Sequence, residues 1–462
     1  ARQRPPALRE GDATAPPERL LQAIWFHQRL RREQLRGADG HALRVLHPGF
    51  WNREAGPDFR GAVVQFDGEA ARSGDVEIDV ATAGWHGHGH DRNPAFANVI
   101  LHVVWERAAG PATQPTLELR GVLDSPLAEL NDWLGGEHSA DLPADLRGRC
   151  SAPLRDLAEP AFSELLLQAA RVRLQAKAAT FTARARESGW EQALWEGLFA
   201  ALGYKHNVWP FRRLAELLPT FRRSDSPLTW QARLFALGGL LPVELPHRAS
   251  GSDDYVKRLW DLWWRERDEW RELVLPRSLW RFHGLRPANQ PQRRLALAAY
   301  WRAAGDLPAR LERWLNADEP TKKRPAALLK LLQVERDEFW SWHATLNSPR
   351  VSKPQALLGA PRASDLAINV LLPWFWARAA AGRSAAMQRR VEEVYFAWPA
   401  SEDNAVLKLA RQRLLGARPA QKLATAAAQQ GLLQIVRDFC ERSNALCEQC
   451  QFPDLVRQFR SE

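Results

Sequence analysis

The feature that most constrains the fold of this chain is a change in hydrophobic pattern near residue 127. Between residues 40 and 120 the apolar residues come in short, β-branched bursts that Gly and Pro separate. Such bursts are typical of strands, and we expect strands at residues 42–46, 60–66, 75–80, 98–105 and 116–119. After residue 127 the apolar residues recur at helical spacing instead. The pattern predicts an α+β protein, in which a mixed α/β module is followed by a large, irregular, all-α domain.

A helix is expected over residues 17–35, because Pro16 and Pro17 open a stretch with helical apolar spacing. Residues 98–105, NVILHVVW, are almost continuously apolar, which predicts a central buried strand. Further helices are expected at residues 157–188, 191–202, 230–237, 254–272, 293–303, 363–381 and 405–415. We divide the chain into a disordered segment (1–16), an α/β module (17–126), a helical domain (127–439) and a Cys-rich metal-binding segment (440–462).

The overall composition, with 45% hydrophobic and 26% charged residues, is ordinary for a globular protein. No apolar run approaches the ~18 residues that span a bilayer. The first 17 residues are rich in Pro and Arg and lack the apolar core of a signal peptide. We therefore expect a cytoplasmic protein that does not enter a membrane.

The charge favours nucleic acid, DNA or RNA, as a partner. The chain has 64 Lys and Arg against 54 Asp and Glu, a net charge of +10, and its first lysine is Lys177. Arginine is always ionised and its planar fork suits phosphate. A GC-rich genome would also replace Lys by Arg. The 21 Trp could stack on bases, but their helical spacing favours the core for most of them.

The candidate site lies in the strand-rich module. Asp58 stands at the start of one expected strand, and Glu77 and Asp79 lie within the next. Because side chains alternate along a strand, Glu77 and Asp79 share one face, and Val76, Ile78 and Val80 face the other. Carboxylates inside a strand are costly unless they are paired or bind metal. We expect Asp58 and Glu77 to hold Mg²⁺ or Mn²⁺, which prefer oxygen ligands.

Histidines gather beside these carboxylates. Residues 86–90 read HGHGH, and His102 lies in the next expected strand. Neutral imidazole is a metal ligand or a general base near pH 7. Histidines at alternate positions of an extended loop can point to one side, so His88, His90 or His102 is predicted to bind metal or to act in catalysis. A polar loop beside one core histidine is the plainer alternative.

The spacing of these acids resembles the PD-(D/E)XK nuclease pattern, in which an acid after Pro is followed by acid–x–lysine on the next strand. Asp79 stands at the lysine position, and the module contains no lysine. Arginine could not replace the lysine as a base, because it does not readily lose a proton. The resemblance implies a metal-dependent nucleic-acid phosphodiesterase in which a histidine replaces the lysine. The alternative is a catalytically inactive nucleic-acid-binding or interaction protein on a degenerate nuclease core. A hydrolase of small substrates would fit the histidines but not the charge.

Four cysteines, Cys150, Cys440, Cys447 and Cys450, suggest a structural metal site. Three of them have the spacing C-x6-C-x2-C, and clustered thiols in a cytoplasmic chain favour metal over disulfides. The spacing resembles the cluster loop of endonuclease-III-type glycosylases, and one distant Cys with a C-terminal trio is similar to RecB-type nucleases. We expect a [4Fe–4S] cluster or zinc.

Two basic segments of the helical domain are candidates for contact with nucleic acid. Arg171, Arg173 and Lys177 lie on one acid-poor helix, and a solvated helix face is their alternative. Arg286, Asn289 and Arg293 belong to RPANQPQRR, a rigid turn that could contact phosphate or bases or could only cap a helix.

The chain as a whole resembles the bacterial family catalogued as domain of unknown function 2851. The resemblance is carried by LRVLHPGFWNREAGPDFRGA (43–62), GDVEID (74–79), WHGHGHDRNPAFANVILHVVWE (85–106), RPANQPQRR (286–294), and QQGLLQIVRDFC with the Cys cluster (429–450). It implies a GxVE-x-(H/D) site, since members carry His where this chain has Asp79. It implies no activity, which has to be argued from the site.

Overall fold

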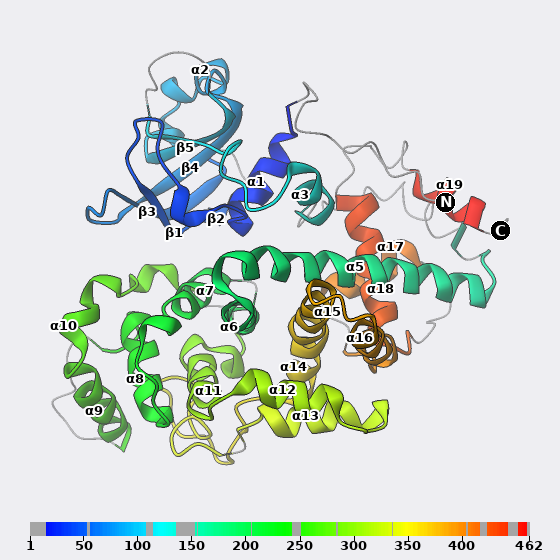
Figure 1. The fold of residues 1–462 in the computed structure, drawn as a ribbon. Helices are drawn as coiled ribbons and strands as arrows, with labels where there is room; N and C mark the ends of the chain where they lie inside the picture. Colours follow the sequence, from blue (N-terminus) through cyan, green and yellow to red (C-terminus); the bar gives the residue numbers. More distant parts are fainter. Residues whose placement is uncertain are drawn as a thin grey trace. The chain divides into compact units, whose positions relative to one another are not determined.

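The structure is a computed structural model, and it divides into two compact units. It describes residues 15–52, 56–107, 114–134, 153–154, 156–204, 206–242, 251–282, 285–334, 336–402, 405–415, 423–441 and 451–459. One unit is drawn from residues 1–164, 406–420 and 432–462, and the other from residues 165–405 and 421–431. The first contains the sheet and the second is helical (Figure 1). The fold class is α+β, as predicted. The predicted domain boundaries stay predictions.

The first unit is built on one six-stranded mixed sheet with the order β1-β3-β4-β5-β6, and β2 pairs with β3. The strands are β1 (Leu43–His47), β2 (Phe50–Trp51), β3 (Phe59–Phe66), β4 (Arg72–Ala81), β5 (Val99–Glu106) and β6 (Thr116–Glu118). Strands β1, β3 and β4 pair antiparallel, whereas β5 runs parallel to both β4 and β6. The apolar run at residues 98–105 is therefore an inner strand, as expected.

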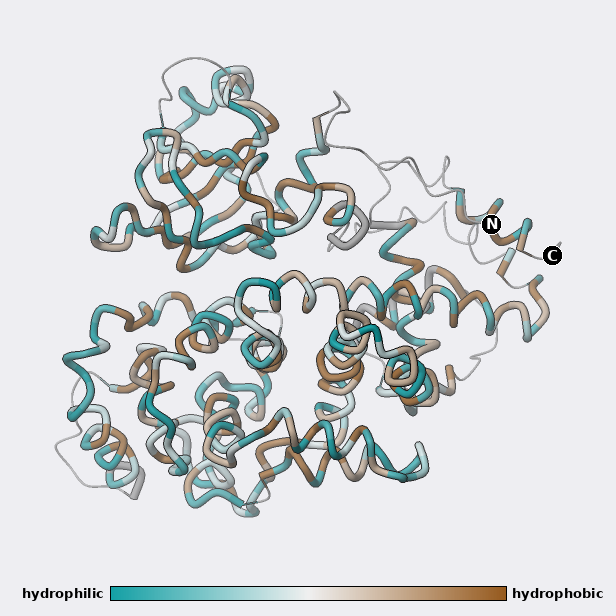
Figure 2. The backbone as a smooth tube through the Cα atoms, in the orientation of Figure 1, coloured by the Kyte–Doolittle hydropathy of each residue, from teal (hydrophilic) through white to brown (hydrophobic). Residues whose placement is uncertain are grey.

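The two faces of β4 differ as the alternation predicts. Val76 and Ile78 are fully buried in a cluster with Leu101 and Val103 of β5 and with apolar residues of helix α1 (Glu18–His27). Glu77 and Asp79 point to the other face. Figure 2 shows hydrophobic residues in the strands of this unit. The core thus fixes the orientation of β4, because a shift of one residue would turn the carboxylates into the apolar cluster.

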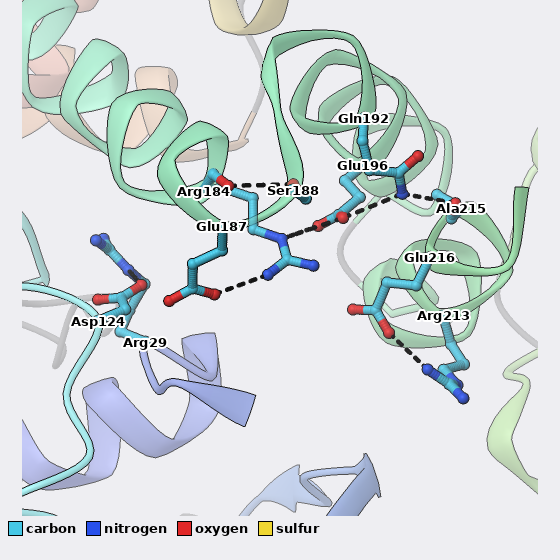
Figure 3. Close-up of polar contacts among 10 residues, drawn as sticks. All are labelled: Arg29, Asp124, Arg184, Glu187, Ser188, Gln192, Glu196, Arg213, Ala215 and Glu216. Atoms are coloured by element: carbon cyan, nitrogen blue, oxygen red, sulfur yellow. Dashed lines mark hydrogen bonds and ion pairs between the residues drawn. The ribbon is translucent and has the colours of Figure 1, made fainter. Parts of the chain in front are cut away.

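Helix α1 ends at His27 rather than near residue 35. Gln28 adopts a left-handed backbone conformation with φ 48° and ends the helix. Beyond it, the chain pairs with the segment after β6, since Asp124 N donates to Arg29 O and Arg31 N donates to Val122 O. Arg29 also forms an ion pair of 2.7 Å with Asp124 (Figure 3). These long-range bonds replace the next turns of the expected helix.

The remaining helices match the predicted ranges 157–188, 191–202, 230–237, 293–303 and 405–415 closely, whereas several of them, for example at residues 208–216 and 307–316, lie outside any predicted range. They are α2 (Gly84–Gly87), α3 (Leu127–Leu134), α5 (Glu159–Ser188), α6 (Trp190–Leu202), α7 (Val208–Glu216), α8 (Pro227–Leu237), α9 (Gly251–Trp264), α10 (Arg267–Trp270), α11 (Pro291–Ala303), α12 (Leu307–Asn316), α13 (Arg324–Leu332), α14 (Ala360–Leu366), α15 (Leu372–Ala381), α16 (Ala385–Ala397), α17 (Ala405–Leu414), α18 (Ala426–Val436) and α19 (Phe452–Phe459). Among the described residues, none of the helices combines the length and apolar composition needed to cross a bilayer.

The helix expected at residues 363–381 contains a wide turn. A π-helical turn, Ala367–Leu371, joins α14 to α15 just before Pro373. Proline has no N–H to donate and its ring crowds the preceding turn, so a helix that continues through it must rearrange locally. Here the wider turn allows the apolar run to continue into α15.

Candidate metal centre

Parallel pairing of β4 with β5 brings three polar side chains onto one face of the sheet. Glu77 pairs with His102 in the register of these strands, and Asp79 follows two residues later on the same side. All three residues are buried, with exposed fractions of 7% for Glu77, 2% for Asp79 and 3% for His102. The sheet therefore removes two carboxylates and an imidazole from water, which requires partners for them.

The segment after β4 folds back over these side chains. It is not the extended loop that the sequence suggested, because α2 (Gly84–Gly87) and the 3-10 turn η2 (His90–Arg92) coil it. Gly89 between them has φ 72°, a left-handed conformation that suits glycine. This coiling separates the three histidines. His86 lies 3.4 Å from Asp91, whereas His88 and His90 reach the sheet.

Two carboxylates and three imidazoles converge here. Asp79 Oδ1 lies 3.1 Å from His88 Nδ1, and Asp79 Oδ2 lies 2.9 Å from His102 Nε2. Glu77 Oε1 lies 3.1 Å from His90 Nε2. One ligand atom each from Asp79, His88 and His90 falls within 4.8 Å of the others, close enough for a single metal ion to bind all three.

The surroundings of His90 fit a metal ligand. Its ring stacks on Phe96 at 4.0 Å between centroids and lies against Trp85. Its Nε2 is buried, and within the described part of the chain it has no partner in hydrogen-bond geometry, although Glu77 Oε1 is near. A buried ring nitrogen without a hydrogen bond is costly. Coordination of a metal ion would satisfy it, so the residues present fit such an ion.

Asp58 joins this group through the backbone. Its amide N donates to Glu77 Oε2 at 3.0 Å, and its carboxylate accepts from Ile78 N at 3.1 Å and from Gln22 Nε2 at 2.8 Å. The same Gln22 nitrogen donates to Glu18 Oε1 at 3.1 Å. Asp58 and Glu77 are thus neighbours, and α1 supplies two residues that the sequence analysis did not single out. Glu18 and Gln22 lie four residues apart on α1, and this spacing, which places both on one helix face, is the sequence signal that identifies them.

The carboxyl groups of Asp58 and Glu77 hold protons more tightly than isolated ones do. Burial and the neighbouring Glu18 carboxylate together raise the pKa of Asp58 to about 7. Burial and the Asp58 carboxylate raise the pKa of Glu77 to about 9. Such shifts arise where carboxylates are removed from water and lie close to one another. A divalent cation would offset their negative charge.

The arrangement differs from the expected one in its ligands. The expected pair, Asp58 and Glu77, is linked by a hydrogen bond from the Asp58 amide to Glu77 Oε2, whereas the group with metal-ligand spacing is Asp79, His88 and His90. Imidazole ligands suit Zn²⁺, Fe²⁺ or Mn²⁺ better than Mg²⁺, which prefers oxygen and keeps its water. His102 is buried behind Asp79 and orients it, as partners of metal ligands commonly do.

A family model described as protein of unknown function (DUF2851) matches residues 18–404. The chain belongs to this family. No curated protein and no solved structure matches the chain.

The DUF2851 match covers every residue of the centre, from Glu18 to His102. Of the predicted Cys ligands, Cys150, Cys447 and Cys450 lie outside the described residues. For Cys440 only the backbone, within the π-helical turn Arg437–Glu441, is described. The iron–sulfur or zinc site therefore stays a prediction.

The basic run on α5 makes contacts within the helical unit. Arg171 lies 3.6 Å from Glu392, and Arg173 and Lys177 donate to Gln430 Oε1 at 2.7 and 3.0 Å. Lys177 also bonds Asn369. Farther along α5, Arg184 binds Glu187 and Glu196 (Figure 3). The N–H donors predicted to contact phosphate thus have partners within the protein.

The turn RPANQPQRR is largely structural. Arg293 is only 3% exposed and donates to the carbonyls of Trp340, His343, Gln355 and Ala356, so it does not lie where nucleic acid could contact it. Asn289 Oδ1 accepts from Arg294 at 2.9 Å. Arg286 is exposed and is the member of the predicted trio that lies at the surface.

Proposed function

We propose that the protein is a metal-dependent phosphodiesterase that acts on nucleic acid. The observation that carries the proposal is the convergence of Asp79, His88 and His90 within 4.8 Å beside the buried Glu77. Asp79, His88 and His90 would hold one divalent ion. Such an ion supplies positive charge for a phosphate and favours deprotonation of water.

The other residues have positioning roles in this proposal. His102 orients Asp79 through its second carboxylate oxygen, and Trp85 and Phe96 enclose His90. Asp58 fixes the start of β3 against β4, since its backbone amide and its side chain both form hydrogen bonds with residues of β4. A rigid second layer of this kind keeps metal ligands in place.

Nucleic acid is proposed as substrate for two reasons. The net charge of +10 favours a polyanion. The upstream helix α1, the strand that begins after Asp58, and the next strand carrying Glu77 also follow the order of elements in the PD-(D/E)XK pattern. Asp79 with its histidines occupies the place where that pattern has lysine.

The test combines metal binding with cleavage. We expect the wild type to bind one Mn²⁺ or Zn²⁺ more tightly than Mg²⁺ in calorimetric titrations, and to cleave single- or double-stranded DNA or RNA when loaded. His90→Ala should weaken binding by at least about 10-fold and cleavage by about 100-fold or more. His86→Ala changes an exposed histidine of the same segment and should leave both unchanged. A wild type that binds no metal, or whose cleavage survives in His90→Ala, would overturn the proposal.

The departure from the lysine-bearing pattern favours one competing function, an inactive core that only binds nucleic acid. That protein would bind polynucleotide without cleaving it at any metal concentration. The cleavage assay with Mn²⁺, Zn²⁺ and Mg²⁺ separates the two.

A further inference from the structure

A hydrogen-bonded bridge ties the start of α1 to the centre. Gln22 Nε2 has two hydrogens and donates to Glu18 Oε1 at 3.1 Å and to Asp58 Oδ1 at 2.8 Å. The bridge holds the Glu18 carboxylate beside Asp58, which itself bonds β4. Glu18 is thus fixed at the centre by a side chain one helical turn away.

Glu18 differs from the other carboxylates in its access to water. Glu77 and Asp79 are buried and Asp58 is half-buried, whereas Glu18 is exposed. A group that takes a proton from a reacting water must release it again, and an exposed carboxylate can do so directly to solvent. Among the four carboxylates, Glu18 alone combines this exposure with a fixed place at the centre.

The charges around Glu18 support a base. Partial burial and the Asp79 carboxylate raise its pKa, whereas His88 lowers it. Asp58 and Glu77 are also close enough to Glu18 for its charge to affect their pKa values. Partial burial acts whether or not a metal ion is bound to Asp79, and a carboxylate whose pKa is raised is a stronger proton acceptor. The position of Glu18 in the first turn of α1 keeps the deprotonated form accessible, because the helix N-terminus favours an anion.

We propose that Glu18 is the general base of the hydrolysis, an inference that rests on the proposed function. Glu18 accepts a proton from the attacking water, and the electron pair of that O–H bond forms the new P–O bond. The P–O bond to the leaving oxygen breaks, and this oxygen takes a proton from bulk water. Glu18 then returns its proton to solvent, which completes the hydrolysis. Gln22 is a positioning residue in this scheme.

The test compares Glu18→Gln with wild type at saturating metal. A base contributes about 10²–10⁴-fold, so we expect kcat to fall about 100-fold or more. The rise of kcat with pH on the acid side should be lost. Mn²⁺ affinity, measured by calorimetry, should change by less than about twofold, because Glu18 is not a ligand. Glu18→Asp restores a carboxylate and should recover part of the rate and the pH dependence.

Glu69→Gln is the matched control, since Glu69 is an exposed glutamate of the same unit that pairs with Arg72. It should keep the wild-type rate. An unchanged rate and pH profile in Glu18→Gln would overturn the role of Glu18 while leaving the proposed function standing. A loss of Mn²⁺ affinity in that variant would make Glu18 a ligand and would also overturn it. A wild type without metal-dependent cleavage would overturn the proposed function itself.

Discussion

At the scale of single residues, Gly84 determines how closely α2 approaches the metal ligands. A Cβ at this position would lie 2.5 Å from Asp79 Oδ1 and 2.6 Å from Asp79 Cγ. Gly84→Ala must therefore displace Asp79 or α2. We expect metal affinity to fall by about 10–100-fold, the usual effect of disturbing the support of a ligand. Calorimetric titration with Mn²⁺ measures it.

Gly87 provides the matched control on the same short helix. No atom lies within 4 Å of a Cβ built there. Gly87→Ala should bind metal as the wild type does. Equal affinities of the two variants would contradict the placement of Asp79 against α2.

His47 predicts a loss of stability in acid. Burial lowers its pKa to about 4, so between pH 6.5 and about 4 the unfolded chain binds a proton that the folded chain does not. The free energy of unfolding therefore falls as the pH falls through this range, by about 3 kcal/mol in all. His47→Asn retains an acceptor for the Gly49 N–H and should lose this slope in urea denaturation. The exposed-site variant His86→Asn should keep it. A slope that persists in His47→Asn would assign it to other groups.

At the scale of elements, α18 crosses α5 at a glycine. A Cβ on Gly431 would lie 2.1 Å from Leu166 O, a backbone atom that cannot rotate away. Gly431→Ala should force the helices apart and lower the stability of the helical unit by about 1–3 kcal/mol. Gly359→Ala, whose new Cβ would make an ordinary contact of 3.8 Å with Pro361, should change the thermal midpoint little. Equal midpoints for the two variants would contradict this close crossing.

At the scale of the whole molecule, the net charge of +10 predicts salt-dependent binding to polynucleotide. Counterion release makes the logarithm of the binding constant fall linearly with the logarithm of the salt concentration. The exposed Arg286 is the first residue to test, and Arg286→Gln should reduce the slope by about 1 if it contacts one phosphate. Fluorescence anisotropy with labelled DNA and RNA measures the slope for the wild type and for the variant. A wild-type slope near zero would show that the positive charge of the chain does not bind polynucleotide.

The sequence by itself determined the features that depend on local periodicity. The alternation in residues 75–80 correctly placed Val76 and Ile78 in the core and Glu77 and Asp79 on the opposite face. The helical spacing located α5, α6, α8, α11 and α17 to within a few residues. Both succeed because the direction of a side chain follows from its own backbone geometry, whatever the rest of the chain does.

Tertiary structure decided everything that depends on segments meeting. The order HGHGH could not show that α2 and η2 turn His86 away and bring His88 and His90 to β4. Nor could the sequence show that α1 ends at His27, or that Arg293 donates to backbone carbonyls. The deciding partners are carboxylates of β4 for His88 and His90, and distant backbone groups for the segment after α1 and for Arg293. Such bonds form only once the sheet and helices have packed, so no local pattern encodes them.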